Sequence, residues 1–267
     1  MPFGNIKLND GNKVPAIAFG TGSALNNTDV TNSIIQALKT GFSHLDTAQR
    51  YGSERYVGAA IKESKLSRAD IFVCTKYNSG PTFRQSLEES LERLSMTYVD
   101  LYLIHYPERM ENHEWREVEM IKQDGLARSI GVSNYNLQQL QALVERAKIK
   151  PAVNQIYLHP YNYKDHKALI EYAARYDIVI EAYGCLDPIT KYPGGPVDAP
   201  VAAAANRRGV LPVQILLAWV KAKVAVFITT STSKHHLQEH LAAADIRPLT
   251  QYEIAAIDVA GACGLPS

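Results

Sequence analysis

The sequence predicts an α/β fold, a (β/α)8 TIM barrel with an N-terminal β-hairpin and a short C-terminal tail, and three observations support this prediction. Short apolar β segments alternate with helical segments eight times, which is typical of parallel strands that are covered on both faces. No Gly-x-Gly-x-x-Gly follows the first strand, so the fingerprint of the open dinucleotide-binding sheet is missing. Polar residues stand where several strands end, and a barrel carries its reactive groups at those ends.

The hairpin is expected at the start of the chain, where residues 5–8 and 13–16 flank an Asp-Gly pair, a strong hairpin signal. Such a hairpin could plug the bottom of the barrel. The barrel strands are expected as short apolar runs at residues 16–19, 42–45, 71–75, 99–104, 129–132, 152–156, 178–183 and 225–228. The helices are expected where apolar residues recur with a period of 3.6, at about residues 30–38, 53–63, 82–94, 111–123, 137–147, 164–176, 234–243 and 250–259.

One region departs from this alternation. Residues 186–200 are rich in proline and glycine, and they predict a loop that is long enough to be functional and could fold over a ligand. The chain has 267 residues, close to the roughly 250 of a typical barrel, so a single domain over residues 1–267 is expected.

The composition indicates a globular protein with a sizeable core, because 46% of the residues are hydrophobic and 21% are charged. The net charge of +1 gives no overall field that would attract nucleic acid or an anionic membrane. The longest apolar run, residues 215–220, is far shorter than the roughly 20 residues of a membrane span, and the first residues do not resemble a leader. A cytoplasmic protein, a monomer or a weak dimer, is expected.

The cysteines and histidines do not predict a metal site. Cys74, Cys185 and Cys263 have neither metal-ligand spacing nor the density of a disulfide framework, which fits a reducing compartment. The histidine pair at 235–236 and His240 have no carboxylate-rich or thiolate companion, so no metal is expected.

The most informative stretch is residues 44–54, a short buried strand that ends in Asp46 and a loop that delivers Tyr51 five residues later. Two later strands run directly into Lys76 and His105. Each of these residues alone would more often be structural: a cap, a packed aromatic, a solvated charge or a hydrogen-bonded strand end. At the carboxyl ends of barrel strands, however, all of them could face one pocket.

The local frames are Asp46-Thr47-Ala48-x-x-Tyr51-Gly52-x-Glu54, Thr75-Lys76 and Ile104-His105-x-Pro107, and together they resemble the catalytic tetrad of the aldo-keto reductase superfamily. The resemblance covers nearly the whole chain. It implies that an aldehyde or ketone is reduced to an alcohol with hydride from a bound cofactor. Tyr51 would be the general acid, with its pKa lowered by Lys76. Asp46 would orient Lys76, and His105 would donate to the carbonyl oxygen.

The resemblance also implies a set of cofactor contacts. Ser133, Asn134 and Gln155 would hold the nicotinamide amide, and Tyr183 would stack on its ring. A helix cap for the first two, and a place in the core for Tyr183, are the alternatives. The two glycines near residue 21 either admit a ligand close to the backbone or form a simple turn. The complete expected set is Gly20, Thr21, Gly22, Ser133, Asn134, Gln155, Tyr183, Leu186, Thr230, Ser231, Ser233, Lys234, His236, Glu239 and His240.

The adenosine end departs from the family pattern. Thr230 and His236 stand where the family usually has a lysine and an arginine around the 2′-phosphate. The hydroxyl of Ser231, the helix N-terminus near Ser233 and the charge of Lys234 could still bind a phosphate, although a helix cap and a solvated charge are alternatives. Fungal members that reduce conjugated polyketones and keto-lactones have a similar Thr-Thr-Ser stretch. NADPH is therefore expected in preference to NADH.

The expected substrate pocket differs from the aldose-reductase pattern. Gly22 and Tyr106 stand where that branch has tryptophans, and Asn78 replaces a third aromatic. The resemblance thus implies a roomier, more polar wall that prefers compact dicarbonyls, keto esters, keto-lactones or bulky ketones to sugars. Most members continue past the point where this chain stops, at Ser267, into a loop that closes the pocket, which implies a more open site.

Two other functions remain open at this point. The barrel could bind NADPH as a regulatory subunit or sensor without significant turnover, or it could be a cofactor-independent isomerase or lyase. The partners expected under the leading interpretation are NADPH and a small-molecule carbonyl substrate, with no nucleic acid and no membrane.

Overall fold

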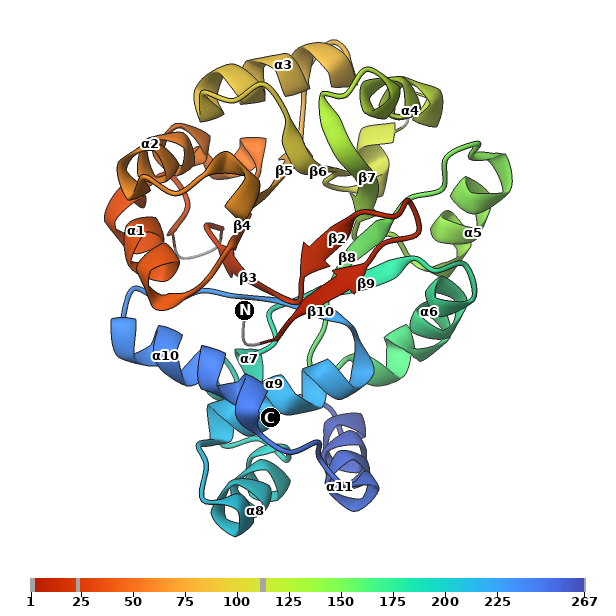
Figure 1. Cartoon of the computed structure of the whole chain (residues 1–267). Coiled ribbons are helices and arrows are strands. Elements are labelled where there is room, and N and C mark those ends of the chain that lie inside the picture. Colours follow the sequence, from red (N-terminus) through yellow and green to blue (C-terminus); the bar gives the residue numbers. More distant parts are fainter. Residues whose placement is uncertain (1–2, 23–24, 111–113, 267) are drawn as a thin grey trace.

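A computed structural model describes residues 3–22, 25–110 and 114–266 of the chain. Its centre is a closed barrel of parallel strands in the order β10-β3-β4-β5-β6-β7-β8-β9, viewed along its axis in Figure 1. The barrel strands are β3 (Ile17–Gly20), β4 (His44–Asp46), β5 (Phe72–Tyr77), β6 (Val99–Ile104), β7 (Ala127–Ser133), β8 (Val153–Tyr157), β9 (Val179–Tyr183) and β10 (Val226–Thr229). The pairing of Phe227 with Ile17 closes the barrel, and the expected (β/α)8 fold is confirmed.

Helices surround the barrel (Figure 1). They are α1 (Thr31–Thr40), α2 (Glu54–Ser64), α3 (Phe83–Leu94), α4 (Trp115–Gln123), α5 (Leu137–Arg146), α6 (Tyr163–Arg175), α7 (Asp187–Thr190), α8 (Asp198–Arg208), α9 (Pro212–Lys223), α10 (Lys234–Ala242) and α11 (Gln251–Ala262). The side chains of Thr82, Asn136 and Thr250 cap α3, α5 and α11 by accepting a hydrogen bond from the first turn. Within the described ranges, no helix combines the length and the apolar character needed to cross a bilayer.

The N-terminal hairpin closes one mouth of the barrel. Its strands are β1 (Asn5–Lys7) and β2 (Lys13–Pro15), paired antiparallel. The Asn9 side chain donates to the Pro151 carbonyl oxygen at 2.9 Å, just before the start of β8. Leu8 and Val14 are buried in the lower barrel interior, in one apolar cluster with Leu101. The hairpin therefore plugs the amino-terminal end as expected, and the mouth at the carboxyl ends of the strands is the one left for a site.

The segment between β9 and β10 differs from the expectation. Residues 186–200 are not simply a loop, because α7 lies within them and α8 begins before their end. Pro200 is tolerated because it lies in the first turn of α8, where its missing N–H removes no helical hydrogen bond. Helix α9 was not expected either. Its centre, residues 214–220, is buried on all sides, so it lacks the polar face that produces a helical period.

The remaining helices agree with their expected positions to within a few residues. The helix expected at 111–123 begins at Trp115 in the structure. Residues 111–113 of that expectation lie outside the described residues.

Candidate active site

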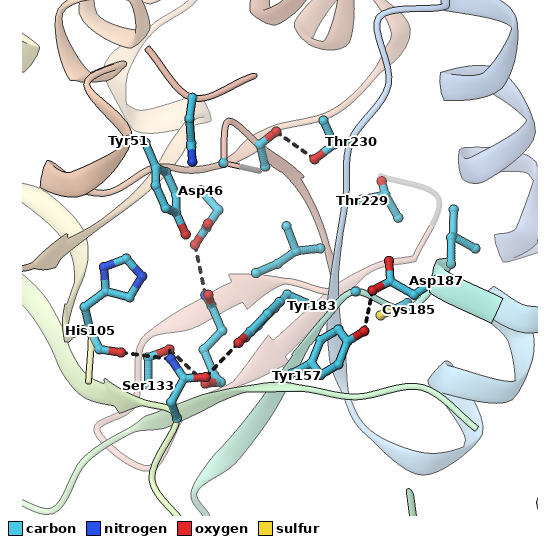
Figure 2. A pocket seen from close by; sticks show the side chains of 18 of the residues that line it. Asp46, Tyr51, His105, Ser133, Tyr157, Tyr183, Cys185, Asp187, Thr229 and Thr230 are labelled. Carbon is cyan, nitrogen blue, oxygen red and sulfur yellow. Dashed lines mark hydrogen bonds between the residues drawn. The ribbon is translucent and has the colours of Figure 1, made fainter. Parts of the chain in front are cut away.

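A cavity of about 420 Å³ opens at the carboxyl ends of the barrel strands (Figure 2). The last residues of six strands line it: Gly20, Asp46, Ser133, Tyr157, Tyr183 and Thr229. This size suits a small molecule, and the position is where barrels carry their reactive groups.

Lys76 and Asp46 form a buried ion pair beside this cavity. The Lys76 Nζ lies 2.6 Å from Asp46 Oδ1 and also donates to the Thr47 carbonyl oxygen at 2.9 Å. Burial is the largest single effect and lowers the pKa of Lys76, but the charge and hydrogen bond of Asp46, together with the effects of Tyr51 and Cys74, outweigh it and raise the pKa. The ammonium is therefore kept charged although the side chain is inaccessible to solvent.

Tyr51 reaches the same place from the short 3₁₀ helix η2 (Gln49–Tyr51) that follows β4. The Lys76 Nζ lies 3.5 Å from the Tyr51 hydroxyl and 5.0 Å from its ring centre. Burial raises the pKa of Tyr51, and this effect exceeds the opposing effect of the Lys76 charge. The expected fall in the pKa of Tyr51 is thus wrong. The residue is a neutral phenol with a proton to donate, and Lys76 limits the rise in its pKa without reversing it.

His105 follows β6 and faces Tyr51. The two ring centres are 5.5 Å apart and the planes nearly perpendicular, while the Tyr106 ring stacks on the imidazole at 4.6 Å. Burial, followed by the positive charge of Lys76, lowers the pKa of His105 to about 3, so the imidazole is neutral near pH 7. In the described part of the chain its Nδ1 is buried without a hydrogen-bond partner, which leaves Nε2 as the nitrogen accessible from the cavity. One carbonyl oxygen could accept from Nε2–H and the Tyr51 hydroxyl together.

Gln155 links this group to a second buried acid. Its Nε2 donates to Asp46 Oδ2 at 2.9 Å and to Glu181 Oε2 at 3.0 Å. An amide nitrogen has two hydrogens, so both are used, and the Gln155 Oε1 is left as the atom that can accept a hydrogen bond from the cavity. Glu181 was missed in the sequence, although an acid inside the apolar run of β9 was a usable signal.

The burial of Glu181 leads to a testable prediction about how the stability of the protein depends on pH. Burial raises its pKa to about 7 from an ordinary value of 4.5. Between these pH values the folded chain holds a proton that the unfolded chain has released, so Glu181 makes the protein less stable as pH rises. We expect the free energy of unfolding of Glu181→Gln, relative to the unmodified protein, to increase by about 2 to 3 kcal/mol between pH 5 and pH 8. Denaturant titrations at several pH values measure this difference, and a difference independent of pH contradicts the prediction.

Asn134 connects the ends of three strands. Its φ of 63° lies in the left-handed region, which asparagine tolerates better than most residues, and it turns the chain at the end of β7. Its Nδ2 donates to the His105 carbonyl oxygen at 2.9 Å, and the Tyr183 hydroxyl donates to its Oδ1 at 2.8 Å. The alternative in which Ser133 and Asn134 cap the following helix is wrong, because Asn136 caps α5.

The glycines near residue 21 are required by the protein's own packing. A Cβ at Gly20 would lie 2.7 Å from Ile228, and one at Gly22 would lie 2.8 Å from the Tyr51 ring. Gly22 lines the cavity, and the Tyr51 ring occupies the space that a Cβ at this position would take. Thr21 is fully buried, does not line the cavity, and donates through its hydroxyl to the Asp46 carbonyl oxygen at 3.1 Å.

Only one of the residues expected at the adenosine end lines the cavity. Thr230 does so, and its hydroxyl donates to the Gly20 carbonyl oxygen at 2.9 Å. Ser233 caps α10 by accepting from the backbone N–H of His236 at 3.4 Å, so the helix-cap alternative is what the structure shows for it. The expected residues that do not line the cavity are Ser231, Ser233, Lys234, His236, Glu239 and His240.

Two of these residues bring little positive charge to a phosphate. Burial lowers the pKa of His240 to about 4, which keeps its imidazole neutral near pH 7. The Glu239 carboxylate lies 3.0 Å from the imidazole of His235 on the next turn of α10. Lys234 and the first turn of α10 are therefore the groups of this segment that remain to attract an anion.

Of the residues expected in the substrate pocket, some line the cavity and others do not. Tyr106 lines the cavity, as does Leu186 of the expected cofactor set, but Asn78 does not. The backbone N–H of Asn78 donates to Gln49 Oε1 at 2.9 Å, which holds the residue in the loop after β5.

Three charged residues of the lining were not expected: Arg50, Asp187 and Lys191. Asp187 Oδ2 accepts from the Tyr157 hydroxyl at 2.5 Å and from Lys191 Nζ at 2.8 Å. Residues 186–200 were expected to form a loop. The helical spacing of four residues that brings Asp187 and Lys191 together was therefore not considered. Arg50 stands directly before Tyr51, so its place in the motif was a usable signal.

Comparisons with known proteins agree with this arrangement. The Aldo/keto reductase family model matches residues 16–188 and 196–262. The chain is 35% identical over 245 residues to the NAD/NADP-dependent indole-3-acetaldehyde reductase of Schizosaccharomyces pombe, with 86% of each protein covered. It is 32% identical over 248 residues to the methylglyoxal reductase DkgA of Salmonella typhimurium, covering 91% of this chain and 88% of that protein.

A solved structure supports the same assignment. The Bombyx mori aldo-keto reductase in complex with NADP matches with a TM-score of 0.86 at 32% identity, covering 96% of this chain and 92% of that one. The family model, the sequence relatives and the fold all point the same way: the chain belongs to the aldo/keto reductase family and is an oxidoreductase.

Proposed function

We propose that this protein is an NADPH-dependent carbonyl reductase that converts aldehydes or ketones to alcohols, with Tyr51 as the general acid. The observation that carries this proposal is the meeting of the Tyr51 phenol, the Lys76 ammonium and the His105 imidazole at one cavity. Asp46 completes the group through its ion pair with Lys76. If each of these four residues had only a structural role, there would be no reason for all of them to lie together.

In this proposal Tyr51 gives its proton to the carbonyl oxygen as negative charge develops there. Lys76, kept charged by Asp46, stabilises the phenolate that remains, and the neutral His105 donates a second hydrogen bond to the same oxygen. Because the pKa of Tyr51 is raised, the phenol keeps its proton until the substrate is reduced. NADPH, when bound, supplies the hydride.

The cavity wall fits a nicotinamide ring. Gln155 Oε1 is free to accept a hydrogen bond from the carboxamide, because both hydrogens of Nε2 are committed to Asp46 and Glu181. The Tyr183 ring is anchored through its hydroxyl to Asn134 and lines the cavity (Figure 2), where it could fix which face of the cofactor is presented. The Bombyx mori relative was solved with NADP, which supports the same cofactor here.

A preference for NADPH over NADH belongs to the same proposal. The groups we propose for the 2′-phosphate are the hydroxyls of Thr230, Ser231 and Ser233, the N-terminus of α10, the charge of Lys234 and the imidazole of His236. We expect kcat/KM measured with NADPH to exceed the value with NADH. Equal values would mean that these residues do not distinguish the phosphate, as the name of the Schizosaccharomyces pombe relative suggests for that enzyme.

We propose compact dicarbonyls, keto esters and keto-lactones as the substrate class. The cavity of about 420 Å³ has a partly polar lining, and Tyr106 stands where a tryptophan would make the wall apolar. The relative named methylglyoxal reductase acts on a compact dicarbonyl, which supports this choice. A sugar aldehyde giving the highest kcat/KM in a substrate panel would reject it.

The deciding experiment follows the absorbance of NADPH while the purified protein is offered phenylglyoxal, isatin, methylglyoxal and an aldose. We expect turnover of the dicarbonyls. If NADPH raises the melting temperature but no carbonyl is reduced, a sensor or regulatory role replaces the proposal. A ligand that binds only the native state must stabilise it, by about 2.7 kcal/mol at a hundredfold excess over Kd. No change in melting temperature therefore points to a cofactor-independent barrel.

A further inference from the structure

Arg50 is the one charge among the residues that line the cavity for which the described part of the chain provides no opposite partner. The other ionised lining residues are Asp46, Asp187 and Lys191. Asp46 is paired with Lys76, and Asp187 is paired with Lys191. Lys76 lies behind Asp46 and outside the lining, and once it is counted the two pairs cancel and leave the positive charge of Arg50 without a counterion among the described residues.

Arg50 lies on the substrate side of the cavity. It precedes Tyr51 in η2, and its guanidinium carbon is 5.8 Å from the centre of the Tyr106 ring. That ring stacks on His105 at 4.6 Å. Asp187, which neutralises the other cation, lies across the cavity from Tyr51 and His105 (Figure 2). Arg50 is therefore one aromatic ring away from the groups proposed to bind the reacting carbonyl.

The charge of Arg50 also affects His105, one of the two groups proposed to bind the reacting carbonyl. The Arg50 guanidinium is among the groups that lower the pKa of His105, after burial and Lys76. Among the described residues its one hydrogen bond is a long one, 3.5 Å from Nη1 to the Tyr106 hydroxyl, which leaves most of its five N–H donors without a partner there. A planar guanidinium with free donors can bind a carboxylate or a phosphate through two parallel hydrogen bonds, and beside the proposed carbonyl site a carboxylate of the substrate is the anion that fits.

We propose that Arg50 binds a carboxylate of the substrate, so that the cavity prefers short oxo acids over the corresponding neutral carbonyl compounds. This inference rests on the proposed function, because it requires a carbonyl held between Tyr51 and His105. The separation from Arg50 to His105, bridged by Tyr106, leaves room for only a few bonds between the carbonyl and the carboxylate. Four-carbon semialdehyde acids and comparable keto acids meet this condition.

The test compares 4-oxobutanoate with its methyl ester, which has the same aldehyde without the charge. We expect the acid-to-ester ratio of kcat/KM to fall about tenfold in Arg50→Met, because one charge-assisted pair at a partly exposed site is lost. Arg50→Lys, which keeps the charge without the planar fork, should retain part of the preference. Added salt should lower the ratio in the unmodified protein but not in Arg50→Met, because salt screens an exposed ion pair.

Arg55→Met is the matched control. Arg55 is exposed on α2, stacks on Tyr56 and does not line the cavity, so its removal changes the overall charge equally and should leave the ratio unchanged. An equal ratio in the unmodified protein and Arg50→Met overturns the inference. So does an unchanged ratio together with weaker NADPH binding by Arg50→Met, which would assign Arg50 to the cofactor.

A binding measurement separates failure of this inference from failure of the proposed function. If the unmodified protein reduces neither compound nor any dicarbonyl, the proposed function is wrong. Calorimetric titration with 4-hydroxybutanoate in the presence of NADP⁺ then still tests Arg50. We expect binding to the unmodified protein and about tenfold weaker binding to Arg50→Met. Equal affinity for both proteins, or no binding to either, overturns the assignment of Arg50 as a carboxylate ligand.

Discussion

Replacing Tyr51 with phenylalanine is expected to lower kcat for carbonyl reduction by about three orders of magnitude, the scale of a lost general acid. The Kd for NADPH should change by less than about twofold, because the substitution removes an oxygen that the proposal assigns to the substrate and not to the cofactor. Phenylalanine keeps the ring that packs against Gly22, so the loop should hold its shape. Steady-state kinetics and fluorescence titration with NADPH measure the two quantities separately.

Tyr56→Phe is the control for this substitution. Tyr56 lies on the neighbouring helix α2, and its hydroxyl contacts Arg55 outside the cavity. It should lose no measurable activity. If Tyr51→Phe retained more than about a tenth of the original kcat, another group would have to supply the proton, and the assignment of Tyr51 would fail.

Replacing Lys76 with methionine is expected to destabilise the protein by about 3 to 5 kcal/mol, because it leaves the Asp46 carboxylate buried without its cation. The side chains of Lys76 and Asp46 are 0% and 4% exposed, so solvent cannot take over the role of the partner. Chemical denaturation of the two proteins measures the difference. The same variant should also be inactive, because the phenolate of Tyr51 would lose its stabilising charge.

The double variant Lys76→Met with Asp46→Asn separates charge from packing. A neutral pair at these positions leaves no uncompensated charge inside the barrel, so the double variant should recover more than half of the stability lost by Lys76→Met. Its activity should stay low. A double variant that is less stable than Lys76→Met would show that the loss comes from packing and not from the ion pair.

The barrel and the position of its site could be predicted because they depend on local pattern. Strands that are buried on both faces appear in the sequence as continuous apolar runs. The residue after such a run lies at the carboxyl end of the barrel, regardless of where the helices begin and end. Lys76 and His105 were located in this way, and Asp46 and Tyr51 followed from their spacing. The helix α9 was missed for the opposite reason. A helix that is buried on every side has no polar face and therefore no period to detect.

Properties that depend on distant contacts could not be predicted from local pattern. The sign of the pKa shift of Tyr51 is set by how deeply the phenol is buried, which no motif records. Gln155 was expected to face the cofactor, but its bond to Glu181 depends on β8 and β9 being neighbours. That Arg50 has no oppositely charged partner in the described ranges likewise becomes visible only when the partners of the other charges in the lining are known.

The contact between Gly22 and the Tyr51 ring limits how this enzyme can be re-engineered. Even a single methyl group at position 22 would press on the phenol, so enlarging that residue to narrow the active site would move the proposed proton donor out of line. A library aimed at new specificity should therefore leave position 22 fixed and vary Tyr106, which lines the cavity from the segment after β6 and not from the segment that carries Tyr51.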